Sequence, residues 1–144
     1  MTTDKIQMKI LIADDDPIIL EILTKRVAQE GYIVIAASNG EMAWQKIQQE
    51  SPDVIILDLT MPKKDGFEVL KLVRENTSKI RWQPVIIVSA RSELEDMRKG
   101  YTLEADHYLS KPCSMEDILK AIKLMISLIP RRKLQSETNH EKKG

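Results

Sequence analysis

The residues best suited to chemistry follow four separate apolar segments of the chain. Two segments end in carboxylates, a third ends in a hydroxyl and an amino group closely follows the fourth: Asp14 and Asp15, Asp58, Ser89 and Lys111. Carboxylate oxygens are the ligands that hard divalent cations such as Mg²⁺ prefer. Carboxylates about 5 Å apart repel each other by roughly 3 kcal/mol at an effective dielectric near 20, so a cluster of them indicates a bound cation or a function.

Each of these residues, taken alone, has a simpler explanation. Asp16 precedes Pro17 and is expected to cap a helix. A single Ser or a Lys-Pro pair after a strand is usually part of a turn. One helix cap does not require three consecutive acids, however, so Asp14 and Asp15 need another role. The joint occurrence at successive segment ends therefore favours a shared functional site.

Hydrophobic periodicity predicts the elements that bring these residues together. Short apolar runs, typical of strands covered on both faces, alternate with amphipathic helical patterns. Ser92 and Ser114 are the expected N-caps of the last two helices, and Gly100 is the expected stop of the fourth. The predicted strands cover residues 8–13, 32–36, 53–57, 85–88 and 105–109, and the predicted helices cover residues 17–30, 41–49, 66–74, 93–99 and 115–129. This alternation indicates a doubly wound parallel α/β sheet, in which ligands bind beyond the carboxyl ends of the strands.

Length and composition limit the classes of protein to consider. The 144 residues fit one domain, which we place at residues 1–130, and Lys plus Arg equal Asp plus Glu at 22 each. This balance favours neither nucleic-acid binding nor an anionic membrane. There is no signal-peptide pattern and no long apolar span, so we expect a cytoplasmic protein. Residues 131–144 lack an apolar pattern and are expected to be a disordered tail or a linker remnant.

Four motifs carry a resemblance to a known family: ILIADDDP, VIILDLTMPKKDG, PVIIVSA and ADHYLSKP. In order and spacing they are similar to those of the receiver domain of two-component response regulators, chemotaxis regulators among them. The resemblance runs from Met8 to Leu128. It implies a flavodoxin-like (βα)5 fold with strand order 2-1-3-4-5. It also implies a signalling switch that receives a phosphoryl group from a sensor histidine kinase or a phosphotransfer protein, and that slowly dephosphorylates itself.

The resemblance implies a metal-binding role for the acidic residues. Asp58 matches the phosphoryl acceptor of the family. Asp14 and Asp15 match the acidic pair that binds Mg²⁺ together with the acceptor, one directly and one partly through water. Thr60 stands where the family supplies a backbone carbonyl to the metal, and its side chain position tunes how fast water reaches the phosphoryl group.

The remaining matched positions concern the phosphoryl group and the switch. Ser89 matches the hydroxyl that bonds a phosphoryl oxygen, and Lys111 matches the lysine that pairs with that group, before a Pro112 whose peptide bond is usually cis in the family. Arg91 stands at a second tuning position. Tyr108 matches an aromatic residue that rotates inward as Ser89 moves, although a strand-end tyrosine that is simply packed remains the alternative interpretation.

Three departures from the family pattern concern the output face rather than the phosphorylation chemistry. Glu104 replaces a usual Gly, so a backbone position that favours φ > 0 is expected to be rebuilt. Cys113 replaces a usual Phe, and His107 replaces a common acid. The output face consists of the fourth helix, fifth strand and fifth helix. It would bind an unidentified downstream protein or form a homodimer.

Three other kinds of protein share part of this pattern. A haloacid-dehalogenase-like phosphatase would also use an aspartate nucleophile, but it needs a second Asp where this chain has Thr60. A receiver-like binding module that is never phosphorylated is disfavoured because the full set of site residues is present. A fragment of a longer regulator, with Arg131 to Lys133 opening a linker, is not distinguished from a stand-alone receiver.

Overall fold

A single parallel sheet organises the computed structural model, which describes residues 7–76, 82–91 and 93–129. Its strand order is β2-β1-β3-β4-β5. The strands are β1 (Lys9–Ala13), β2 (Ile33–Ala37), β3 (Val54–Leu57), β4 (Val85–Ser89) and β5 (His107–Ser110). The helices are α1 (Pro17–Gln29), α2 (Gly40–Glu50), α3 (Gly66–Glu75), α4 (Leu94–Thr102) and α5 (Met115–Leu128). The predicted α/β class and strand order are confirmed, while the predicted tail, residues 131–144, lies outside the described residues.

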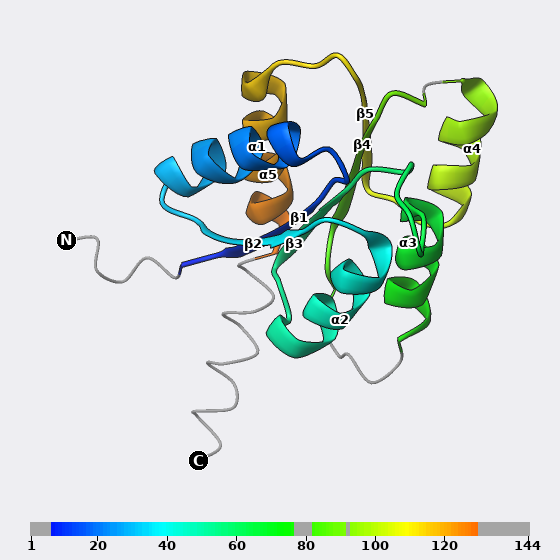
Figure 1. Cartoon of the computed structure of the whole chain (residues 1–144), viewed down its shortest axis with the longest axis horizontal. Helices are drawn as coiled ribbons and strands as arrows, with labels where there is room; N and C mark the ends of the chain where they lie inside the picture. The colour runs from blue at the N-terminus through cyan, green and yellow to red at the C-terminus, as the bar shows by residue number, and fades with distance from the viewer. Residues whose placement is uncertain (1–6, 77–81, 92, 130–144) are drawn as a thin grey trace.

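Helices cover both faces of the sheet (Figure 1). Helices α1 and α5 lie on one face, and α2, α3 and α4 lie on the other. Successive residues of the central strands point alternately into two cores, because side chains alternate across a strand. In β1, Ile10 and Ile12 join the core beneath α1 and α5, whereas Leu11 and Ala13 join the core beneath α2 and α3. Burial on both faces explains why the central strands are continuously apolar in sequence.

The caps of α1 and α5 are those that the sequence predicts. The Asp16 carboxylate accepts hydrogen bonds from the backbone N–H groups of Ile18 and Ile19, at 2.9 and 3.3 Å. Ser114 and Asp117 form a capping box at the start of α5. These local interactions set where the two helices begin. None of the described helices is both long and apolar enough to cross a membrane.

Helix α4 differs from its prediction at both ends. It begins at Leu94, with Glu93 as the N-cap residue, while the predicted cap Ser92 lies outside the described residues. Gly100 does not end the helix but lies inside it, and it is buried. A Cβ atom at Gly100 would lie 3.2 Å from Cδ1 of Ile87 and 3.4 Å from Cδ2 of Tyr108. The prediction of a stop at Gly100 was therefore wrong: the helix continues to Thr102, and the glycine packs closely against the sheet.

Helix α4 ends at Thr102, and the turn after it contains a left-handed residue, Glu104, with φ of 69°. Its N–H donates to the carbonyl of Tyr101 and the N–H of Ala105 donates to the carbonyl of Gly100, both at 2.9 Å. This pair of hydrogen bonds is a Schellman motif. A non-glycine residue in this region costs about 1–2 kcal/mol. The expectation that Glu104 rebuilds the backbone was wrong, since the left-handed conformation is retained without glycine.

An ion pair connects this turn to α3, at a position that the sequence assigned to the last strand. Asp106 accepts hydrogen bonds from Arg74 on α3 at 2.6 Å and from the N–H of Val85 at 2.8 Å. Arg74 Nε also donates to the carbonyl of Glu104 at 3.0 Å. Residues 105 and 106 therefore close the turn, and β5 begins at His107 rather than at residue 105.

Candidate functional site

The register of the sheet places Asp14 beside Asp58. Ala13, the last residue of β1, pairs with Leu57, the last residue of β3. The N–H of Asp58 donates to the carbonyl of Ala13 at 3.0 Å. Both aspartates therefore leave the same edge of the sheet, one residue beyond a paired position. Both are buried, with 2% and 8% of their surface exposed.

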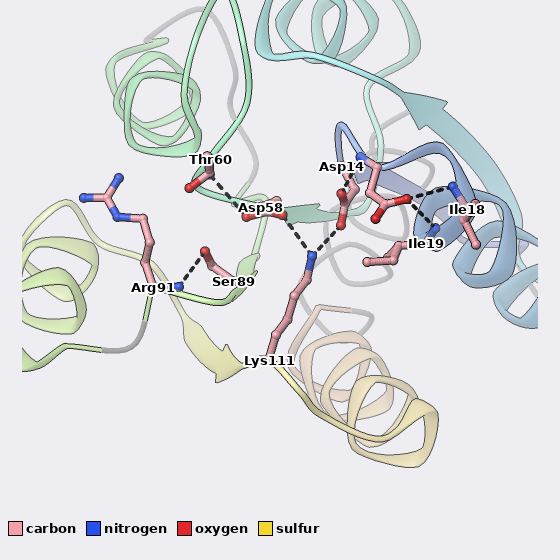
Figure 2. Close-up of polar contacts among 9 residues, drawn as sticks. Asp14, Ile18, Ile19, Asp58, Thr60, Ser89, Arg91 and Lys111 are labelled. Atoms are coloured by element: carbon pink, nitrogen blue, oxygen red, sulfur yellow. Dashed lines mark hydrogen bonds and ion pairs between the residues drawn. The ribbon is translucent and has the colours of Figure 1, made fainter.

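Lys111 joins these two carboxylates. Its Nζ donates to Oδ2 of Asp14 at 2.7 Å and to Oδ2 of Asp58 at 2.9 Å, as Figure 2 shows. The lysine reaches them because Ser110 of β5 pairs with Ser89 of β4 and the N–H of Lys111 donates to the carbonyl of Ser89. The Lys111–Pro112 peptide bond is cis. One cation thus compensates two buried negative charges.

Three carboxylates form a candidate metal centre at this edge. Asp14, Asp15 and Asp58 each offer an oxygen, and these oxygens lie within 4.8 Å of one another. Asp15 is exposed, so the cluster opens to solvent on one side. Asp14 Oδ1 also accepts from the N–H of Asp16 at 2.9 Å, which orients its carboxylate. An all-oxygen donor set of this kind suits a hard divalent ion such as Mg²⁺.

Burial and ion pairing have opposite effects on the charges of the site. Burial raises the pKa of Asp14 above its ordinary value, and this outweighs the hydrogen bond from Lys111. Burial alone would lower the pKa of Lys111, but its hydrogen bonds to Asp14 and Asp58 outweigh burial and raise the pKa. The lysine is therefore firmly protonated at neutral pH, and Asp14 is the carboxylate whose ionised form burial disfavours.

The backbone after β3 is packed tightly around Asp58. The N–H of Thr60 donates to Oδ1 of Asp58 at 3.2 Å. A Cβ atom at Gly66, the first residue of α3, would lie 2.4 Å from the carbonyl oxygen of Asp58. Asp65 caps α3 by accepting from the N–H of Glu68 at 2.9 Å. The glycine allows the start of α3 to lie close against the end of β3, and the cap fixes where the helix begins.

A second group of contacts centres on Arg91, just beyond β4. The N–H of Arg91 donates to Oγ of Ser89 at 3.2 Å, and its carbonyl accepts a hydrogen bond from the hydroxyl of Tyr108. Ser89 is fully buried, and the ring of Tyr108 is buried against α4. The sequence placed Ser89, Arg91 and Tyr108 in one region. It did not show that the backbone of Arg91 is hydrogen-bonded to both the serine and the tyrosine.

Comparison with known proteins decides the family. Residues 10–123 match the response regulator receiver domain. The chain belongs to that family. The alkaline phosphatase synthesis transcriptional regulatory protein PhoP of Bacillus subtilis is 38% identical over 118 residues, which are 82% of this chain and 48% of that protein. Response regulator GtcR of Aneurinibacillus migulanus is 44% identical over 103 residues, 72% of this chain and 41% of that protein. The receiver spans about half the length of these relatives.

Solved structures agree with this assignment. Chemotaxis response regulator CheY4 of Vibrio cholerae is 31% identical, with a TM-score of 0.77 over 83% of this chain and 99% of that one. A receiver domain from a Francisella response regulator is also 31% identical, with a TM-score of 0.76 over 83% of this chain and 96% of that one. The predicted family and flavodoxin-like fold are therefore confirmed, and receiver domains of this family act as signalling switches.

Proposed function

We propose that phosphorylation of Asp58 switches the signalling state of this receiver domain. The observation that carries the proposal is the Asp58 carboxylate itself, which is buried at a strand end, hydrogen-bonded to Lys111 and close to two further carboxylates. Such a carboxylate can act as a nucleophile when neighbouring cations offset the charge of an incoming phosphoryl group. The donor would be a phosphohistidine of a sensor kinase or of a phosphotransfer protein.

The transfer exchanges one bond to phosphorus for another. An oxygen of Asp58 attacks phosphorus, the bond from phosphorus to the donor imidazole nitrogen breaks, and that nitrogen keeps the electron pair. Mg²⁺, which supplies charge neutralisation at the phosphoryl oxygens, would be held by Asp14, Asp15 and Asp58 with the backbone carbonyl of Thr60. These residues suit Mg²⁺ because they offer hard oxygen donors. One oxygen from each of the three carboxylates lies within 4.8 Å of the other two.

Lys111 and Ser89 would bind the phosphoryl oxygens. Lys111 already points at Asp58, at 2.9 Å, and a charged phosphoryl oxygen there would accept a charge-assisted hydrogen bond from the same ammonium group. Ser89 is buried at the end of the neighbouring strand, and its hydroxyl can donate to a second phosphoryl oxygen. Hydrolysis by water would later remove the group, at a rate tuned from the positions of Thr60 and Arg91.

The output would pass through Tyr108. Its hydroxyl already bonds the carbonyl of Arg91, and Arg91 bonds Ser89, so movement of Ser89 toward a phosphoryl group would be felt by the tyrosine. The surface formed by α4, β5 and α5 would then bind a downstream protein or a second copy of the chain. Several relatives are transcriptional regulators about twice as long, so a DNA-binding segment elsewhere in a longer protein is one form that this output would take.

Acetyl phosphate supplies the test of phosphorylation. The purified chain is incubated with acetyl phosphate and Mg²⁺, and its intact mass is measured over time. We expect one phosphoryl adduct that needs the metal, and none when Asp58 is changed to Asn. Asp53→Asn is the matched control, because Asp53 is another buried aspartate but lies at the opposite end of β3. An adduct that persists in Asp58→Asn would refute the proposal.

A further inference from the structure

Arg91 contacts both helix α4 and the residues beside Asp58. Its backbone binds both Ser89 and Tyr108. Its side chain turns instead toward α4, where Nη2 donates to Oδ1 of Asp96 at 2.8 Å. Figure 2 shows Arg91 and Lys111 on opposite sides of Asp58, so the lysine occupies one side of the acceptor while the arginine is held on the other.

An aromatic ring supports this position of the arginine. The guanidinium carbon of Arg91 lies 5.5 Å from the centroid of the Phe67 ring, and Nζ of Lys99 lies 4.6 Å from the same centroid. Phe67 is buried, so its ring offers a fixed face to both cations. Glu93 and Glu95 also line the hollow around Arg91. Among the described residues, Asp96 is the acid that forms an ion pair with it.

We infer that Asp96 is a positioning residue, which holds the guanidinium of Arg91 against α4 and so keeps it off the phosphoryl group on Asp58. This inference rests on the proposed function. The Arg91 side chain is 44% exposed in the ion pair, and that of Asp96 is 17% exposed. An ion pair with one partner this exposed contributes little to the free energy of folding. The effect of Asp96 is therefore on the position of the Arg91 side chain.

The phosphoryl group would compete with Asp96 for the arginine. A phosphoryl group brings close to two negative charges and three strong acceptor oxygens, and guanidinium groups bind such oxygens in pairs of parallel hydrogen bonds. An arginine released from Asp96 would bind those oxygens from the β4 side of Asp58 and would hinder the approach of water from that side. Asp96 therefore shortens the lifetime of the phosphorylated state.

A double-mutant cycle measures this competition. The chain and its variants are phosphorylated with acetyl phosphate, the donor is removed, and loss of the adduct is followed by intact mass. Asp96→Asn should slow the loss about two- to fivefold, which is the range set by exposed ion-pair energies. Glu95→Gln, which removes a charge from the same turn of α4, should leave the rate unchanged. Asp96→Asn should have no effect when Arg91 is changed to Ala, because no guanidinium is left to release.

A second measurement does not depend on phosphorylation. In the unmodified protein, ¹⁵N NMR of the Arg91 guanidinium should show faster hydrogen exchange in Asp96→Asn but not in Glu95→Gln. Unchanged hydrogen exchange in Asp96→Asn would overturn the inference. So would an Asp96→Asn variant that loses the phosphoryl adduct as fast as wild type or faster. The inference would also fail if Asp96→Asn slowed this loss equally with Arg91 present and with Arg91 changed to Ala. If the wild-type chain takes up no phosphoryl group, the proposed function fails, and the NMR comparison alone decides whether Asp96 holds Arg91.

Discussion

Lys111→Met tests whether one lysine compensates the buried carboxylates. The substitution removes the ammonium group but keeps an unbranched apolar side chain that can pack along the same path. Asp14 and Asp58 would then lie at the same edge of the sheet with no other cation from the described residues bonded to either of them. Because their side chains are only 3% and 10% exposed, water can replace the lost ammonium only in part.

The expected loss of stability follows from the geometry of the two ion pairs. At distances of 2.7 and 2.9 Å each attraction is about 6 kcal/mol at an effective dielectric of 20, before the cost of desolvating the lysine is subtracted. Removing one partner of a buried pair costs about 3–5 kcal/mol net. Lys111 is 21% exposed, so we take the lower end, about 3 kcal/mol. This corresponds to a fall in Tm of roughly 10 °C for a domain of this size.

Urea denaturation without divalent ions is the assay. Lys111→Arg, which keeps the charge, is the matched control and should lose much less stability than Lys111→Met. Millimolar Mg²⁺ should restore part of the loss, because it returns a positive charge to the same carboxylates. A Lys111→Met variant as stable as wild type in the absence of Mg²⁺ would show that the carboxylates do not need the lysine, and the electrostatic account of the site would be wrong.

Three further predictions follow from the same structure. Folding raises the pKa of Asp14, so protonation of this carboxyl group stabilises the folded state, and this stabilisation is lost as the pH rises through the folded-state pKa. The stability that Lys111→Met loses relative to wild type, measured by urea denaturation, should therefore become smaller as the pH is lowered from neutral. Glu104→Gly should raise stability by about 1 kcal/mol in a thermal melt, whereas Glu104→Ala should not, because alanine bears the same left-handed strain. Gly66→Ala should lower both stability and phosphoryl uptake from acetyl phosphate, because its Cβ would lie 2.4 Å from the carbonyl oxygen of Asp58.

Much of the fold could be predicted from sequence because its signals are local. Continuous apolar runs marked strands buried on both faces, and Asp16 and Ser114 marked helix starts through hydrogen bonds within one turn. The edge of the sheet that carries the site followed from the rule for parallel strands. These features depend on neighbours in the chain or on a general property of the fold.

Other features depend on contacts between distant segments. The sequence grouped Lys111 with Asp14 and Asp58 in one site, but it did not show which of these residues form ion pairs. The ion pair of Lys111 with Asp14 joins residues 97 positions apart and depends on the register of four strands. Gly100 resembled a helix stop, although it lies inside α4 and packs closely against Ile87 and Tyr108 of the sheet. The pairing of Arg91 with Asp96 was equally hidden, because several acids lie nearby and only the fold selects one of them.

Chemical trapping identifies the residue that carries the phosphoryl group, which we propose to be Asp58. Borohydride reduces an aspartyl phosphate to homoserine, which marks the acceptor permanently. After treatment with acetyl phosphate and Mg²⁺ and then borohydride, peptide mass mapping should find homoserine at residue 58. Homoserine at Asp14, at Asp15 or at no residue would contradict the account.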